Sequence, residues 1–148
     1  MAIDPAGNLY VVDGRYHNVT GVGPTSRKIT PAGVVSTIAG RADLPPGLVD
    51  GPVASAQLTV DTGAPISDSH AWLAVDASGN VYATDPRNRV VRKIGADGQV
   101  STLVGRPWGK GFVAGDLPGL IDEPTGIAVR DSRLFISTSH AVAAVKLP

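Results

Sequence analysis

The stretch that decides the fold is residues 1–13, MAIDPAGNLYVVD, because it returns at residues 73–85 as LAVDASGNVYATD. The shared positions carry distinctive chemistry and keep a constant spacing: Asp4, Gly7, Asn8, Tyr10 and Asp13 in the first copy, and Asp76, Gly79, Asn80, Tyr82 and Asp85 in the second. A match of this length does not arise by chance. The chain is therefore built from an internal repeat, with one supersecondary unit in each copy.

A second phrase repeats further along the chain. RKITPAGVVSTIAGR at residues 27–41 returns as RKIGADGQVSTLVGR at residues 92–106. Its offset is shorter than that of the first phrase, so the first copy carries an insertion between Asp13 and Arg27, within RYHNVTGVGPTS.

A third and weaker copy begins with GIAVRDSRLFIST at residues 126–138, where Leu134 and Phe135 stand in the places of Val81 and Tyr82. We therefore predict a single domain in three units, which are repeat 1 (1–71), repeat 2 (72–124) and a partial repeat 3 (125–148).

The composition favours β-structure. Of the 13 acidic residues all but Glu123 are aspartate, and the chain holds 18 glycines and 12 prolines. Helices favour glutamate, whereas turns use aspartate, glycine and proline for local hydrogen bonds, positive φ and fixed φ. The sequence therefore predicts an all-β fold with many turns.

Each full copy divides into four short apolar segments separated by turn residues. In the second copy they cover residues 73–76, 80–85, 89–94 and 99–105, with Asp-Ala-Ser-Gly-Asn and Gly-Ala-Asp-Gly as tight turns. Runs such as LYVV and LFIS are apolar at successive positions, which a strand requires only when both faces of its sheet are covered. We therefore expect four-stranded antiparallel meanders that stack face to face, as blades do around a propeller axis.

The two repeated phrases together resemble the NHL repeat of β-propellers in its long bacterial form. The resemblance covers most of the chain and is specific in the first two copies. The third copy departs from it, because Arg130 replaces the first aspartate, AVAAVKL replaces the Arg-Lys-Ile strand, and the fourth strand is missing. Such a unit is either a terminal cap or part of a longer propeller.

About three units in one chain are too few to close a propeller, which has roughly four to eight blades. Left open, the first and third units would each expose an apolar face, and the last strand would present an unpaired edge. We therefore expect a head-to-tail homodimer that forms one six-bladed ring. The alternatives are that neighbouring blades come from a longer parent chain or from a different partner chain.

The same topology predicts where binding residues lie. In an up-and-down blade, the second-to-third turns and the blade-to-blade connections emerge on one side, which we call the loop-rich face. It would carry the insertion around residues 14–26 and the crossings 41–72 and 106–125. Loops on a rigid scaffold commonly bind ligands, so we nominate the aromatic and cationic residues there: Arg15, Tyr16, His17, Arg41, Trp72, Arg106, Trp108, Lys110 and Phe112.

Most other repeated residues are expected to serve the fold. The shared aromatic position should lie in the blade core: Tyr10, Tyr82 and Phe135. The repeated aspartates should cap turns and strand ends: Asp4, Asp13, Asp76 and Asp85. The repeated arginines should form a bond between blades rather than contact a ligand: Arg27 and Arg92.

Two further sets of residues have a structural interpretation beside a functional one. Trp108, between Pro107 and Gly109, would either contact a ligand or fix its loop to the blade. The spacing of the histidines supports no metal site, so we expect solvated or capping roles for His17, His70 and His140.

Charge and motifs exclude several function classes. The 13 basic and 13 acidic residues balance, which gives no reason to expect a nucleic-acid or membrane partner. There is no cysteine, no run of about 20 apolar residues and no signal-peptide pattern at the start, so we expect a soluble chain whose compartment the sequence does not indicate. Residues 105–110, GRPWGK, lack the spacing and the Ser/Thr of a phosphate loop.

Two function classes remain. The first is a non-catalytic scaffold that binds a protein or ligand and assembles with itself, without a cofactor and with no nominated catalytic residue. The alternative is a propeller enzyme of lyase or hydrolase type, which the resemblance permits, with a divalent cation or ligand in the central channel. For it the sequence offers only a thin set of side chains: Asp61, Asp68, His70 and Glu123.

Overall fold

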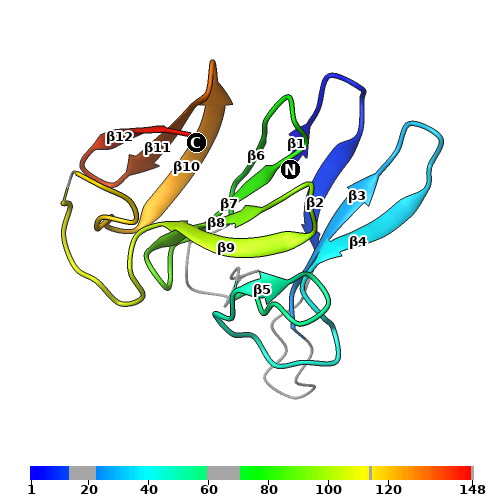
Figure 1. The fold of residues 1–148 in the computed structure, drawn as a ribbon, viewed down its shortest axis with the longest axis horizontal. Coiled ribbons are helices and arrows are strands. Elements are labelled where there is room, and N and C mark those ends of the chain that lie inside the picture. Colours follow the sequence, from blue (N-terminus) through cyan, green and yellow to red (C-terminus); the bar gives the residue numbers. More distant parts are fainter. Residues whose placement is uncertain (14–22, 60–70, 114, 148) are drawn as a thin grey trace.

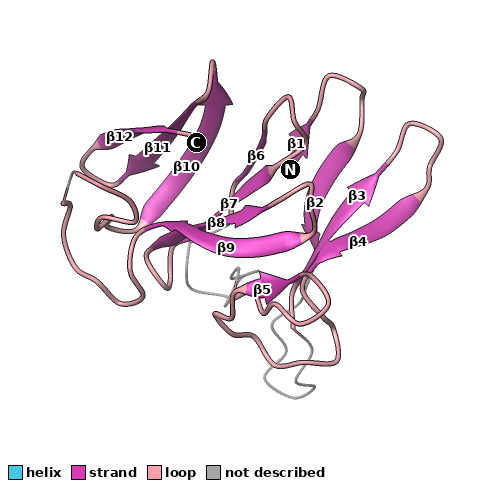
Figure 2. Cartoon of the chain, in the orientation of Figure 1, coloured by secondary structure: helices cyan, strands magenta, loops and turns pink. Residues whose placement is uncertain are grey.

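The computed structural model describes residues 1–13, 23–59, 71–113 and 115–147. These residues form β-strands and loops with no helix among them, and hence no helix that could span a membrane. Figures 1 and 2 show three antiparallel sheets side by side in chain order. The expected all-β fold is confirmed.

The first and third sheets are simple meanders. Blade 1 has the strand order β1-β2-β3-β4, and blade 3 has the order β10-β11-β12. The strands of blade 1 are β1 (Ala2–Ile3), β2 (Leu9–Asp13), β3 (Thr25–Ile29) and β4 (Val35–Ala39). Those of blade 3 are β10 (Pro124–Arg130), β11 (Arg133–Thr138) and β12 (Val142–Lys146).

The middle sheet, blade 2, has a fifth strand that comes from the connection before it. Its order is β5-β9-β8-β7-β6, so β5 lies on the outer edge beside β9 (Figure 1). Its strands are β5 (Gly51–Pro52), β6 (Leu73–Val75), β7 (Val81–Asp85), β8 (Val90–Ile94) and β9 (Gln99–Val104). The four expected segments of the second copy are confirmed, whereas β5 was not expected.

The repeated phrase builds the same hydrogen-bonded turn twice. In blade 2 the Asp76 carboxylate accepts hydrogen bonds from the backbone N–H groups of Ser78 and Asn80, from the Asn80 side chain and from the Tyr82 hydroxyl, at 2.8–2.9 Å. Gly79 closes the turn with a φ of 81°, a conformation that favours glycine. The predicted turn-capping role of this aspartate is confirmed.

Blade 1 repeats these contacts through Asp4. Its carboxylate accepts hydrogen bonds from the backbone and the side chain of Asn8 at 2.9 and 2.7 Å and from the Tyr10 hydroxyl at 3.1 Å. The hydrogen bonds from Asn8 hold the pKa of Asp4 below its usual value, against a smaller opposing effect of burial. Each tyrosine is thereby fixed by a carboxylate six residues before it.

The tyrosines point into the spaces between blades. Tyr10 and Tyr82 are 3% and 1% exposed, which confirms the expected core position. Tyr10 packs in the core between blades 1 and 2, and Tyr82 in the core between blades 2 and 3. Phe135 is 37% exposed, so its predicted burial is wrong for the part of the chain that the structure describes, in which no blade covers that face of blade 3.

We expect Asp76→Asn to lower the free energy of unfolding by about 1–2 kcal/mol at pH 7, because the amide leaves part of a four-donor cluster without an acceptor. Burial alone would raise the pKa of Asp76, but the hydrogen bonds led by those from Asn80 outweigh it and keep that pKa below 3.8. The stabilisation is therefore complete above this pH and is lost as the pH falls through the lower, folded-state pKa.

Urea unfolding of both proteins at pH 7 and at pH 2.5 measures this effect. The difference between them should shrink at the lower pH. Asp97→Asn is the matched control, since the Asp97 carboxylate caps its exposed turn by accepting one hydrogen bond from the Gln99 backbone N–H. A gap of equal size at both pH values would contradict the assignment.

Candidate functional site

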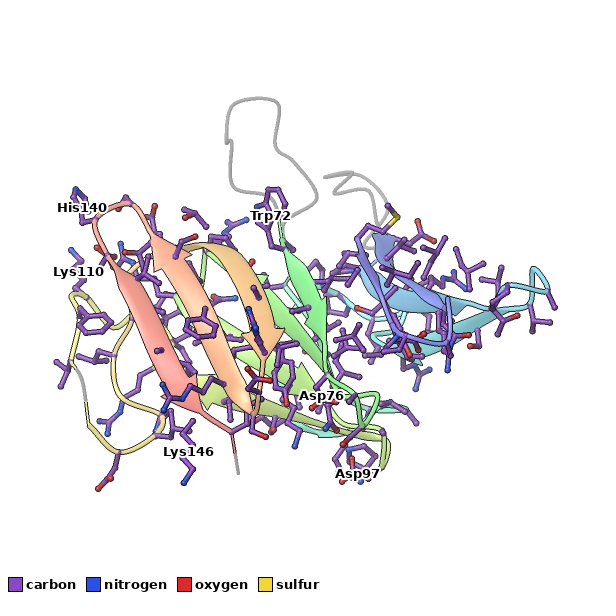
Figure 3. All side chains as sticks on the ribbon, turned by 90° about the horizontal axis from the view of Figure 1, so that it is seen from above. Trp72, Asp76, Asp97, Lys110, His140 and Lys146 are labelled. Atoms are coloured by element: carbon purple, nitrogen blue, oxygen red, sulfur yellow. The ribbon has the colours of Figure 1, made fainter. Side chains whose placement is uncertain are left out.

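The two ends of the blades differ in what they carry. In Figure 3, Trp72, Lys110 and His140 lie along one side of the molecule, whereas Asp76 and Asp97 lie along the opposite side. Asp76 and Asp97 sit in the short turns of blade 2, and the first three belong to connections or to the β11–β12 turn. The structure thus separates short turns from long connections along the blades of the described residues.

The described nominated residues of the loop-rich face are largely exposed. Trp72, Trp108 and Phe112 are 53%, 75% and 49% exposed. Arg106 and Lys110 are also exposed. Three other nominated residues, Arg15, Tyr16 and His17, lie outside the described residues, as do Asp61, Asp68 and His70.

Arg89 holds the crossing between blades 2 and 3 in place. Its guanidinium lies 3.3 Å from the Asp122 carboxylate and 3.7 Å from that of Glu123, at the end of the crossing. It also donates a hydrogen bond to the Gly109 carbonyl at 3.4 Å, near the start. Glu123, the candidate acid of the enzyme alternative, is therefore engaged in an ion pair.

Trp108 lies near the start of this crossing in a strained conformation. Its φ is 58°, which a bulky side chain adopts only at a cost, and its backbone N–H donates to the Asn88 carbonyl at 3.3 Å. With 75% exposure, the indole does not fix the loop to the blade. Strain of this kind clusters at binding sites, so Trp108 remains the leading candidate for contact with a ligand.

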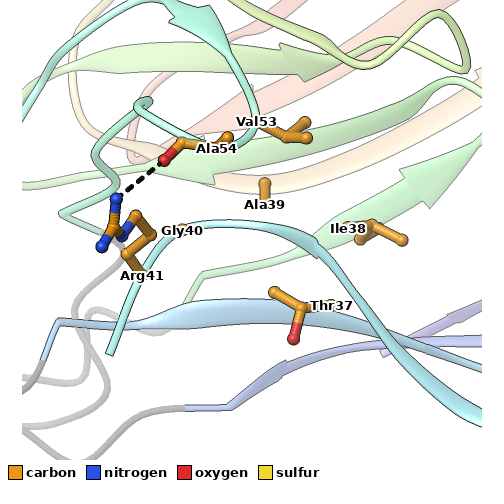
Figure 4. Close-up of a pocket in the computed structure, with 7 residues that line it drawn as sticks. All are labelled: Thr37, Ile38, Ala39, Gly40, Arg41, Val53 and Ala54. Carbon is orange, nitrogen blue, oxygen red and sulfur yellow. Dashed lines mark hydrogen bonds between the residues drawn. The ribbon is translucent and has the colours of Figure 1, made fainter. Parts of the chain in front are cut away.

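A pocket of about 360 Å³ lies between the end of β4 and the turn that follows β5 (Figure 4). Its lining is mostly small or apolar, and Arg41 supplies its one cation: Thr37, Ile38, Ala39, Gly40, Arg41, Val53 and Ala54. Arg41 donates to the Ala54 carbonyl at 3.3 Å and pairs with Asp43. The hydrogen bond to Asp43 raises the pKa of Arg41, and the carboxylate of Asp43 balances the charge of Arg41 within the same connection.

Arg92 anchors the connection before blade 2 to that blade. The connection forms a small hairpin over residues 49–58, which we call the docked hairpin, closed by the bridge between Val49 and Gln57. The guanidinium donates to the carbonyls of Gln57 and Val49 at 3.2 Å and to the Asp50 carboxylate at 2.8 Å. Asp50 also accepts hydrogen bonds from the Thr102 backbone and hydroxyl.

Because Arg92 is buried, its guanidinium requires hydrogen-bond acceptors from the protein. The Arg92 side chain has no solvent exposure. Burial lowers the pKa of Arg92, while the charges of Asp50 and Asp85 oppose that effect. The predicted structural role of Arg92 is confirmed, but the predicted bond between blades is wrong, because its partners belong to the connection that docks on blade 2 and not to blade 1.

Arg27, at the matching position of blade 1, has a different environment. It lies 3.4 Å from the Asp13 carboxylate and donates to the Thr37 hydroxyl at 3.1 Å, both in its own blade. Its side chain is 34% exposed. The predicted inter-blade bond is thus wrong for Arg27 within the described residues, because the partners of its guanidinium there belong to blade 1 itself.

Sequence reasoning missed the docked hairpin. Asp50 stands 42 residues before its partner Arg92 in the chain, so no local pattern links them. The available signal was the repeated arginine itself, since a buried guanidinium requires acceptors from another segment. Its carboxylate partner had to be found among the acids outside the repeat.

No model of a known protein family matches the chain, and no curated protein matches it. Solved structures do. A structural genomics protein of unknown function from Bacteroides thetaiotaomicron is 23% identical with a TM-score of 0.68, over 93% of this chain and 32% of that one. An auxiliary nutrient binding protein from the same organism is 18% identical with a TM-score of 0.60, over 91% of this chain and 33% of that one.

These two likenesses show the fold, a propeller-like arrangement of antiparallel blades. The chain spans about a third of the length of each of these proteins. A virginiamycin B lyase from Staphylococcus aureus also matches, at 16% identity over 99% of this chain and 54% of that one. Its TM-score of 0.34 is too low to bear on fold or function. The resemblance to the NHL repeat stays a prediction.

We expect Arg92→Lys to lower the free energy of unfolding by about 2–4 kcal/mol, because an ammonium cannot serve Val49, Gln57 and Asp50 together and leaves buried acceptors unpaired. Arg27→Lys is the matched control, and it should cost less than about 1 kcal/mol, as its contacts are partly exposed. Chemical unfolding of both variants measures the difference. Equal losses would contradict the distinct roles of the two arginines.

We expect Trp108→Ala to leave the unfolding temperature nearly unchanged, because the indole buries little surface. Trp108→Gly should raise the unfolding temperature, because glycine adopts this φ without strain. The expected gain in the free energy of unfolding is up to about 1 kcal/mol. Differential scanning calorimetry of the three proteins tests this. A loss of several kcal/mol in the alanine variant would make Trp108 a structural residue.

Proposed function

We propose that this chain is a non-catalytic, propeller-type binding scaffold of the NHL-repeat kind. Two copies join head to tail in a six-bladed ring, and the loop-rich face binds a protein or small molecule. One observation carries the proposal. Positions that are buried in blade 2 by the unit before it are partly or largely exposed in blade 1, although the sequence repeats their apolar character.

The open face of blade 1 supports the proposed ring, because its apolar residues are more exposed than their counterparts in blade 2. Val100 of blade 2 is 2% exposed, whereas its counterpart Val35 is 57% exposed. Val81, Ala83 and Ile94 of blade 2 are at most 2% exposed. Their counterparts in blade 1 are apolar and only partly buried: Leu9, Val11 and Ile29. This face is therefore as apolar as the buried face of blade 2, but, among the described residues, it lacks the covering that buries that face.

Blade 3 presents the complementary open face. Leu134 and Ile136 point to blade 2 and are fully buried, so Phe135 between them points away. Phe135 pairs across the sheet with Ala144, and Val142, two residues earlier, is 71% exposed. An aromatic residue among small apolar ones matches the Tyr10 and Tyr82 positions, which the following blade covers. The far face of blade 3 therefore fits the open face of blade 1 in a second copy.

The loop-rich face is the proposed binding surface of the ring. Trp108, Phe112 and Leu117 lie exposed on the crossing between blades 2 and 3, which Arg89 fixes at both ends. Exposed aromatic residues on a fixed backbone lose little side-chain entropy on binding, as binding residues should. No observation on the described residues favours the enzyme alternative over this proposal.

Light scattering of the purified chain tests the ring. We expect a mass near twice the 15.1 kDa of one chain. Phe135→Asp should reduce it to that of the monomer, because it buries a charge in the new interface. Phe112→Asp is the control, as it changes another exposed phenylalanine, outside the interface, and should leave the dimer intact.

A monodisperse monomer of the unchanged chain at micromolar concentration would contradict the proposed ring. A dimer that survives Phe135→Asp would place the contact elsewhere.

A further inference from the structure

The outer edge of blade 2 is completed by a segment from outside the four-stranded meander. Gly51 pairs with Val100 and Pro52 with Gln99, and the Val53 N–H donates to the Gly98 carbonyl at 3.0 Å. Ala56 and Leu58 of the same hairpin are at most 2% exposed in the core between blades 1 and 2. One short stretch thus pairs with the edge strand β9, supplies the acceptors of Arg92 and adds apolar side chains to the core.

Blade 1 has the same features that bind the docked hairpin in blade 2, but no such segment is bound to it among the described residues. Arg27 and Thr37 match Arg92 and Thr102 in the repeat, and Val34 and Val35 on the edge strand side are 61% and 57% exposed. The backbone turn is also reproduced, because the Gly33 N–H donates to the Thr30 carbonyl as the Gly98 N–H does to Gly95. Within the described residues, nothing pairs with the outer edge of β4.

The charges indicate what is missing. In blade 2 the guanidinium of Arg92 faces two carboxylates, those of Asp50 and Asp85. In blade 1, among the described residues, Arg27 forms an ion pair with one carboxylate, that of Asp13, which is 63% exposed. A second carboxylate at the position of Asp50 would reach both Arg27 and the backbone N–H of Thr37.

We infer that the outer edge of blade 1 is a docking site for an extended peptide segment that carries an aspartate followed by Gly-Pro. The segment adds a short antiparallel strand to β4, as in β-augmentation. Its aspartate binds Arg27 and Thr37, and apolar residues on either side cover Val34 and Val35. Its chemistry is that of residues 47–58, GLVDGPVASAQL.

This site is independent of ring closure. The core on the blade 1 side of blade 2 contains residues from two segments. The docked hairpin contributes Ala56 and Leu58, and blade 1 contributes Tyr10 and Ala39. A blade and a segment can therefore occupy neighbouring parts of the same face. The segment can also dock on a single chain.

The test adds the segment in the same relation to blade 1 that it has to blade 2. A second copy of residues 47–72 is placed directly before residue 1, because Leu73 is the repeat counterpart of Met1. Hydrogen exchange of the Thr37 amide is followed, and light scattering records the mass of each sample. We expect strong protection of this amide, which is edge-exposed in the unextended chain.

The control is the same extension with Asp50→Asn in the added copy alone. It should lose about tenfold or more of the protection at Thr37, since a charge-assisted hydrogen bond is replaced by a neutral one. Arg27→Lys in the extended chain should have a similar effect, whereas Arg130→Lys, on an exposed side chain, should have none.

Two results would overturn the inference: an unprotected Thr37 amide in the extended chain, or equal protection with aspartate and asparagine. The free peptide of residues 47–58 provides a second measurement on the unextended chain by NMR titration. Shifts confined to β4 and weakened by Asp50→Asn support the site, and shifts elsewhere count against it. The mass of each sample separates these outcomes from ring formation.

Discussion

The central strands of the middle blade, β7 and β8, are covered on both faces. All five residues of β7 are buried, and four of the five in β8, including the charged Arg92. A sheet of this kind is stable only when something covers each side, because water removed from both faces supplies its driving force. Blade 1, blade 3 and the docked hairpin each supply part of the cover, and so the arrangement of the whole chain follows from the needs of one sheet.

Polar side chains determine how blade 2 packs against the segments that cover it. The carboxylate of Asp76 fixes the turn between β6 and β7 and at the same time orients the Tyr82 hydroxyl, so the ring of Tyr82 enters the core toward blade 3. Arg92 acts in the opposite direction, toward blade 1, where it binds the docked hairpin. One side of the blade is thus specified by a tyrosine and the other by an arginine, and each requires a particular neighbour.

The sequence predicted what depends on local chemistry. Strand positions, the Asp76 turn and the burial of Tyr82 follow from residues close together in the chain. Two features depend on distant contacts and were missed or misplaced. Asp50 meets Arg92 across 42 residues, and Phe135 is exposed because its burial depends on a neighbour outside the repeat. The positive φ of Trp108 is a local feature that was also missed, because Trp108 is the third residue of the turn that the Gly109 N–H closes on the Arg106 carbonyl.

The docked hairpin also bears on how such chains are divided for engineering. A cut at Trp72, where the repeated phrase resumes, would separate Arg92 from Asp50 and leave a buried cation without its acceptors. A cut before Gly47 would keep the hairpin with the sheet that it stabilises. Designers who shuffle or multiply these units should therefore treat the connection that precedes a blade as part of that blade.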